Sequence, residues 1–179
     1  MPEPLKPAAA KLFGRANWVY VPTVSGFATG TGPTVAEATA SSGLDISRIL
    51  FEGGIEPTQN TNLVEQQRRF ADTTVNQFIG QTTYTGGTFV FQFDQQGAAG
   101  SDGVKAWETF RLGVSGFFLR RMNVARATNF TAGQFVDVFK VETGPAMPIA
   151  QGSGENAEGA ASASFALTAD PIFKVAIQA

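Results

Sequence analysis

The stretch from Phe78 to Asp94, FIGQTTYTGGTFVFQFD, constrains the fold of this chain more than any other part of its sequence. Two β-prone runs flank Gly86-Gly87, and glycine readily adopts the positive φ angles that a two-residue hairpin turn requires. Because side chains alternate between the two faces of a strand, Phe89, Phe91 and Phe93 would share one face with Phe78, Thr82 and Tyr84 of the other strand. The other face would carry mostly threonine and glutamine. The pattern therefore predicts a β-hairpin with one core face and one polar face.

The chain carries little charge for its length. Charged residues make up 16% of the 179 residues, whereas about a quarter is typical of globular domains. So few charges, together with 20 glycines, favour a surface that is largely covered, most simply by other copies of the chain. A glycine-rich β monomer is the alternative. The net charge of −2 provides no support for tight nucleic-acid binding, which needs a basic face.

Cysteine and histidine are both absent. Their absence excludes disulfides, a thiolate nucleophile and a Cys/His zinc site, and it removes the usual partner of a nucleophilic serine. Carboxylates could pair for glycoside hydrolysis, but those near predicted strand ends lie in no recognisable motif: Asp94, Asp102, Glu108, Asp137 and Glu142. We therefore predict that the protein is not an enzyme and uses no cofactor or metal.

The N-terminal residues 1–16 contain three prolines and no hydrophobic period, so we predict an extended arm. This region lacks the apolar core of a signal peptide. No apolar run in the sequence approaches the roughly 20 residues that a membrane-spanning helix needs. We expect a protein without a membrane partner that is made in the cytoplasm of a cell and either kept or assembled there.

Residues 17–179 are predicted to form a single domain of short strands separated by glycine, proline and polar clusters. The expected fold is mainly β (α+β), an antiparallel sandwich or barrel of about seven or eight strands with one flanking α-helix. Besides the hairpin, strands are expected at residues 17–21, 46–51, 114–127, 135–142, 162–168 and 173–178. A short helical turn is expected after Pro33.

The flanking helix is predicted at residues 103–111, with Asp102 as its N-cap. Val104, Trp107 and Phe110 would form its apolar stripe. Two polar segments without a hydrophobic period, 53–69 and 144–159, are predicted to be long loops. Loops of this length are usually functional or disordered.

Arginines cluster after the predicted helix, and Arg68-Arg69 forms a second pair. Contact with a phosphate backbone, contact with carboxylates of a neighbouring subunit, and ordinary salt bridges within the chain are the alternatives. Because the chain is net negative, we favour contacts between subunits, made by Arg120, Arg121 and Arg126.

The order of elements resembles that of the major tail tube proteins of long-tailed, siphovirus-type bacteriophages. The resemblance covers residues 17–179. It rests on the long segment after the second predicted strand (53–69), the single central helix (103–111) and the C-terminal block ASFALTADPIFKVAIQA. In that block a strand, a Thr-x-Asp-Pro turn and a closing strand follow one another.

This resemblance implies a tail-tube-like β protomer that self-assembles into hexameric rings stacked as a tube, whose lumen conducts DNA during ejection. It implies location in the virion tail, transient and non-specific passage of DNA, and contact with tape measure, terminator and distal tail proteins. The segment 53–69 would join successive rings, through Glu56, Pro57, Gln59, Asn62, Glu65, Arg68 and Arg69. The polar face of the hairpin would line the lumen, through Thr83, Gln92 and Asp94.

Two other readings stay open from the sequence. The chain could be another virion assembly subunit, such as a tail terminator or decoration protein, or a small β-barrel protein that binds a ligand. Rings or tubes formed by the purified protein would favour the tail tube interpretation. A protein that stays monomeric and has a ligand pocket would favour the interpretation as a small ligand-binding β-barrel.

Overall fold

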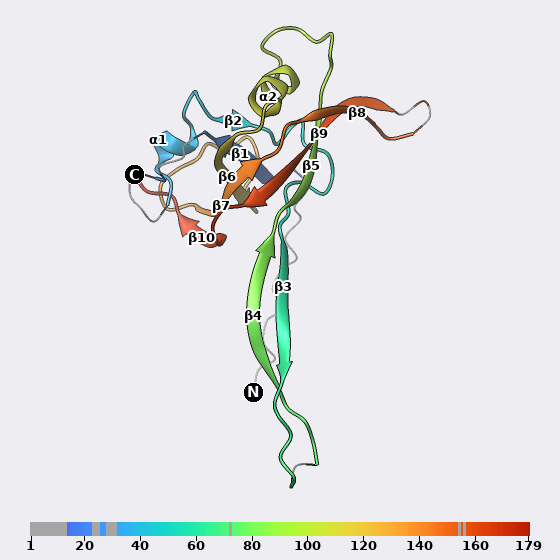
Figure 1. Ribbon diagram of the computed structural model, residues 1–179. Coiled ribbons are helices and arrows are strands. Elements are labelled where there is room, and N and C mark those ends of the chain that lie inside the picture. Colours follow the sequence, from blue (N-terminus) through green and yellow to red (C-terminus); the bar gives the residue numbers. More distant parts are fainter. Residues whose placement is uncertain (1–13, 23–25, 28–31, 72, 154, 156) are drawn as a thin grey trace, which may run out of the picture.

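A computed structural model of the chain describes residues 14–22, 26–27, 32–71, 73–153, 155 and 157–179 (Figure 1). These residues form ten strands and two short helices, with an antiparallel sheet curled into a half-barrel. The prediction of a mainly β, antiparallel sandwich or barrel is therefore confirmed. The predicted N-terminal arm lies outside the described residues except for its last three positions.

The elements follow the chain in a simple order. They are β1 (Ala16–Val21), α1 (Val35–Ala38), β2 (Leu44–Asp45), β3 (Thr58–Glu65), β4 (Gln77–Thr85), β5 (Gly87–Gln92), α2 (Asp102–Phe110), β6 (Ser115–Met122), β7 (Phe135–Thr143), β8 (Met147–Gln151), β9 (Glu158–Leu167) and β10 (Ile172–Ala176). Eight strands form one sheet, in which β2-β1-β6-β7-β9-β5 is the main order, β10 pairs with β7 and β8 pairs with β9. Strands β3 and β4 pair only with each other.

The core lies on both faces of the strands β1, β6 and β7. Inside the half-barrel, phenylalanines of β5, β6, β7 and β9 pack with Tyr20 and with Phe110 of α2. On the other face, Phe117 and Leu119 of β6 pack with valines of β1 and β7, with Ala38 of α1 and with Ile177. The run of apolar residues in β6 is thus explained within one chain, because both of its faces are covered.

The predicted hairpin at Gly86-Gly87 is wrong. Strand β4 pairs with β3, whereas β5 pairs with β9, so the chain continues from one sheet into the other at Gly86. Neither Gly86 nor Gly87 has a positive φ. Gly86 is required for a different reason, since a Cβ there would collide with the carbonyl oxygen of Phe165.

The core face inferred from the same pattern is confirmed on β5. Phe89, Phe91 and Phe93 are buried, and Phe89 makes edge-on contacts with the rings of Phe110 and Phe118. Their expected companion on β4, Phe78, is 57% exposed because β4 does not turn back onto β5.

Three further predictions differ from the structure. Residues 46–51 do not form a strand; Ile46 and Ile49 are both buried by a helical turn, in which the Leu50 N–H donates to the Ile46 carbonyl. The two expected loops contain strands: β3 lies within 53–69, and β8 lies within 144–159. Helix α2 begins one residue earlier than predicted, so that its N-cap is Ser101.

Candidate assembly interface

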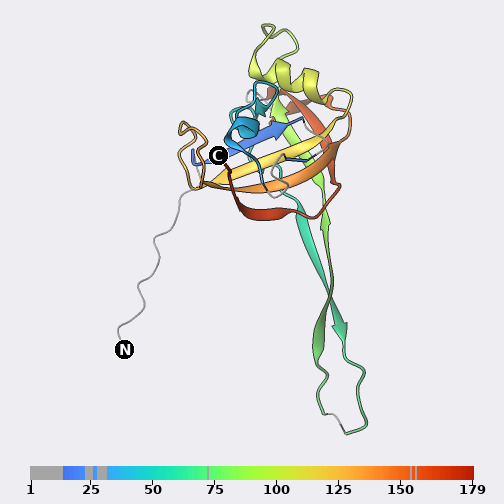
Figure 2. The same cartoon turned by 90° about the vertical axis from the view of Figure 1, so that its left-hand side faces the viewer.

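The hairpin of β3 and β4 projects from the body of the molecule as a long arm, on the side away from α2 (Figures 1 and 2). We call residues 56–85 the arm. Its strands pair antiparallel from Thr58↔Thr85 at the base to Glu65↔Gln77, with an irregularity between Thr61 and Leu63. Every residue of β3 is exposed, as are seven of the nine in β4. The arm therefore presents both faces of a two-stranded sheet.

The arm divides into two zones of different chemistry. Its half nearer the body is rich in threonine, and the hydroxyls of Thr61 and Thr82 hydrogen-bond across the strands at 3.2 Å. Its distal half carries large exposed apolar side chains, which are Leu63, Val64, Phe70, Val75, Phe78 and Ile79. The sequence did not predict this exposed apolar surface, because residues 53–69 lack hydrophobic alternation and Phe78 was expected on the core face of a hairpin.

Arg120 connects the base of the arm to the body. Its guanidinium lies over the rings of Trp18 and Phe139, at 5.5 and 5.4 Å from their centroids. It forms an ion pair with Asp137 at 3.0 Å and a longer one, at 3.8 Å, with Glu56. Asp137 also accepts a hydrogen bond from the backbone N–H of Lys174. One side chain of β6 thus contacts β1, β7 and the arm.

An aromatic contact secures the other strand of the arm. Tyr84, next to the last residue of β4, packs against Phe173 of β10, and Phe173 packs edge-on against Phe139. Together with the Arg120 cluster, this contact fixes the arm at the ends of both of its strands. The arm thus contacts the body at its base, whereas most residues of its two strands are exposed in the described part of the chain.

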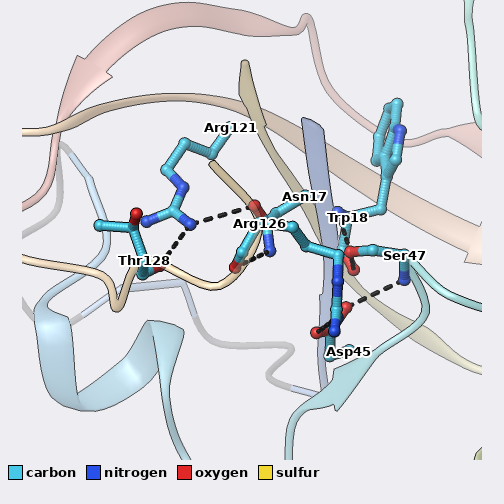
Figure 3. Close-up of polar contacts among 7 residues, drawn as sticks. All are labelled: Asn17, Trp18, Asp45, Ser47, Arg121, Arg126 and Thr128. Carbon is cyan, nitrogen blue, oxygen red and sulfur yellow. Dashed lines mark hydrogen bonds and ion pairs between the residues drawn. The ribbon is translucent and has the colours of Figure 1, made fainter. Parts of the chain in front are cut away.

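Arg121, in contrast to Arg120, points into the protein and is fully buried. One terminal nitrogen donates to the side chain of Asn17 and to the carbonyl of Thr128 (Figure 3). The other donates to the side chain of Gln134 and to the carbonyl of Asn129. Burial lowers its pKa, partly offset by the charge of Asp45. The guanidinium holds residues 128–134 against β1 and is not accessible to a neighbouring subunit.

Arg126 remains at the surface. It forms an ion pair with Asp45 at 3.0 Å, while its backbone carbonyl accepts a hydrogen bond from Asn17 (Figure 3). Arg120 and Arg126 thus have partners within their own chain, as the salt-bridge alternative expected. Their predicted contacts with a neighbouring subunit stay a prediction.

The structure brings the predicted ring-joining residues together on one element. Glu56 and Pro57 lie at the base of the arm, Gln59, Asn62 and Glu65 lie on β3, and Arg68-Arg69 lie at its tip. The predicted lumen residues do not share one face. Thr83 lies on the arm, whereas Gln92 and Asp94 lie at the far end of β5, next to α2, because β4 and β5 are not a hairpin.

The end of the body that carries α2 is grooved. Phe93 stacks on Trp107 with ring centroids 4.6 Å apart, and this pair lines a groove with Glu108 and Arg111. A neighbouring groove is lined by Asp94 and Glu158. Across the described part of the chain, no cluster of potential ligands is arranged to hold a metal ion. Neither helix of the residues that the structure describes is long and apolar enough to span a membrane.

A half-barrel body bearing a fixed but uncovered two-stranded arm is the architecture of a β-rich assembly subunit. Residues 7–179 match the family model described as phage tail tube protein. The chain therefore belongs to the phage tail tube protein family and is a structural component of the virion tail. A search of the curated proteins found no match. Membership in a structural family agrees with the expectation that the protein is not an enzyme.

Proposed function

We propose that this chain forms hexameric rings that stack into a tail tube, with the arm as the contact between successive rings. The observation that carries the proposal is the arm itself. A lone two-stranded hairpin is at best marginally stable in water, and uncovered strand edges and apolar side chains invite association. A contact between the arm of one copy and the body of another is heterologous, so it propagates into a filament and does not close.

The lumen of this tube would conduct DNA during ejection. A wall that lets a polyanion slide should not hold phosphates tightly, because each phosphate neutralised by lysine or arginine strengthens binding. Thr83, Gln92 and Asp94 are polar or acidic and exposed, which suits such a wall. Tape measure, terminator and distal tail proteins would be the partners at assembly, in the cytoplasm of the host of a long-tailed phage.

The register of the arm defines a clean deletion. Residues 60–83 are replaced by Asn-Gly, which joins the paired residues Gln59 and Tyr84 through a two-residue turn. This variant keeps the Glu56–Arg120 ion pair and the Tyr84–Phe173 contact. Electron microscopy of the purified wild type is expected to show rings and tubes. The variant should keep the wild-type circular dichroism and denaturation curve but form no tubes.

Mixing the two proteins provides a stricter test. A subunit without the arm can still receive the arm of a neighbour, so it should stop growth at one end and shorten wild-type tubes as its fraction rises. Tubes of wild-type length made by the folded variant alone would refute the role of the arm. A wild-type protein that stays monomeric at high concentration and binds a small ligand would instead support the ligand-binding alternative.

A further inference from the structure

The distal half of the arm is apolar on both of its faces. Leu63 lies opposite Ile79, and Val64 lies opposite Phe78. Since neighbouring residues of a strand point to opposite faces, the two pairs lie on opposite faces of the arm. Val64 also packs across Gly80, where an added Cβ would come within 2.8 Å of its Cγ2 atom. Gly80 and Phe78 are two residues apart and share a face, which agrees with this assignment.

Nothing in the described part of the chain covers either face. The four side chains are between 48% and 78% exposed. At the tip, Phe70 is fully exposed and Val75 is 46% exposed. A strand that lies on one surface needs apolar side chains on one face only and keeps polar groups on the other. The distal arm does not have that pattern, so a single covering surface would leave one apolar pair in water.

The half of the arm nearer the body shows that this two-sided character is local. Its cross-strand pairs are Thr58↔Thr85, Gln59↔Tyr84, Asn60↔Thr83 and Thr61↔Thr82. Apart from Tyr84, which packs on the body, these residues are polar and suit contact with water. The change from polar to apolar residues along one continuous hairpin indicates that the distal half of the arm is suited to burial away from water.

The shape of the molecule and its exposed apolar side chains indicate what surrounds the distal arm. The end of the body opposite the arm carries α2 (Figure 1) and exposes the apolar side chains of Leu112 and Met147. Met147 follows Ala146, whose backbone N–H donates to the carbonyl of Phe110 at the end of α2. The apolar distal arm thus complements the far end of a second copy of the same chain, with both copies in the same orientation.

We propose that the distal arm inserts between two copies of this chain, so that Leu63 and Ile79 contact one copy while Val64 and Phe78 contact the other. This inference rests on the proposed function, in which the arm joins successive rings. It adds that each arm links three subunits. A ring would then bind the next ring only where two of its subunits are already side by side, which favours complete rings over strings of single subunits.

Two double variants test the faces separately. One is Leu63→Thr with Ile79→Thr, and the other is Val64→Thr with Phe78→Thr. Threonine keeps the β-propensity of the strands and removes apolar surface. The matched control is Thr58→Ser with Thr85→Ser, a cross-strand pair in the polar half. The concentration needed for polymerisation, measured by sedimentation, should rise at least tenfold for each face variant and stay unchanged for the control.

The outcomes separate this inference from the proposed function. If one face variant polymerises like wild type while the other does not, the arm lies on a single surface and the inference is refuted, although ring joining by the arm stands. If both face variants polymerise like wild type, and the arm deletion does too, the proposed role of the arm fails as well. Denaturation curves of the variant monomers should match that of wild type because the substituted side chains are exposed.

Cross-linking provides an independent measurement on assembled tubes. A photo-cross-linking residue is placed at position 79, at position 78, or at both positions of the same arm. Each single label should yield a two-chain product, and the double label should add a three-chain product. If the double label yields only two-chain products while both single labels react efficiently, the insertion between two copies is refuted.

Discussion

The sharpest test of how the chain passes between its two sheets compares Gly86→Ala with Gly87→Ala. At Gly86, an added Cβ would coincide with the carbonyl oxygen of Phe165 and lie 2.9 Å from the Cα of Ala166. At Gly87, the nearest atoms are Cε1 of the Phe165 ring at 3.6 Å and the Glu56 carbonyl oxygen at 3.9 Å, which are ordinary contact distances. The two neighbouring glycines should therefore respond differently to the same substitution.

The change in the free energy of unfolding depends on whether the atoms near the added Cβ can move away. Overpacking typically costs about 1–3 kcal/mol, and backbone atoms of β9 cannot rotate away as a side chain can. We expect Gly86→Ala to lower the free energy of unfolding by about 3 kcal/mol or more, a fall in Tm of roughly 6–12 °C for a chain of this size. Gly87→Ala should be neutral or should stabilise the protein by about 0.5 kcal/mol, because glycine within a strand is less favourable than alanine.

Urea denaturation of the two variants, followed by circular dichroism, measures this difference directly. To keep polymerisation from affecting the transitions, both substitutions are made in the arm-deleted variant and repeated in the full chain. A hairpin turn at Gly86-Gly87 would require positive φ at both positions, and each alanine would then cost a similar 1–2 kcal/mol. Equal losses, or a larger loss at Gly87, would refute the continuous path from β4 to β5.

Three further predictions concern the body. Burial raises the pKa of Tyr20 from 10.0 to about 12, so the unfolded chain loses this proton at lower pH than the folded chain does. The free energy of unfolding should therefore fall by about 2 kcal/mol between pH 10 and 12. Urea titrations at pH 9 and 11.5 should show this loss in wild type and a smaller loss in Tyr20→Phe. Arg121→Met leaves buried hydrogen-bond acceptors without donors and should lower the free energy of unfolding by about 3 kcal/mol in the same assay. Arg121→Lys should recover only part of this stability, because lysine lacks the planar guanidinium group. Thr34→Ala removes the capping box of α1 and should lower the free energy of unfolding by about 1 kcal/mol, whereas Thr39→Ala, at the exposed end of the same helix, should cost less.

The elements that can be predicted from sequence are those that are buried against other parts of the same chain. Phe89, Phe91 and Phe93 alternate because one face of β5 packs on α2 and the other does not. The strands at residues 17–21 and 135–142 can be located from their runs of apolar residues, because both faces of these strands are buried within the chain. The resemblance to tail tube proteins rests on the order of such elements. Periodicity reports burial, so it is informative wherever the partner belongs to the same chain.

The path at Gly86 could not be predicted because its cause is distant in sequence. A glycine pair between two β-prone runs is the strongest local signal of a hairpin. The feature that decides otherwise is the carbonyl of Phe165, almost 80 residues away, against which Gly86 packs. Likewise, the burial of Arg121 cannot be predicted from its neighbours in sequence, because nothing local shows that Asn17 and Gln134 converge on it.

The arm could not be predicted because neither of its faces is buried against the rest of the described chain. Residues 58–65 have no hydrophobic period because no face of β3 is buried against its own chain, and a strand without a buried face reads as a loop. In a two-stranded sheet, large apolar residues at adjacent positions such as Leu63 and Val64 point to opposite faces. They would be a liability in a monomer, where both faces meet water. The same adjacency is what a hairpin needs if each of its faces meets a different subunit, so the missing alternation in the sequence becomes evidence for burial between chains.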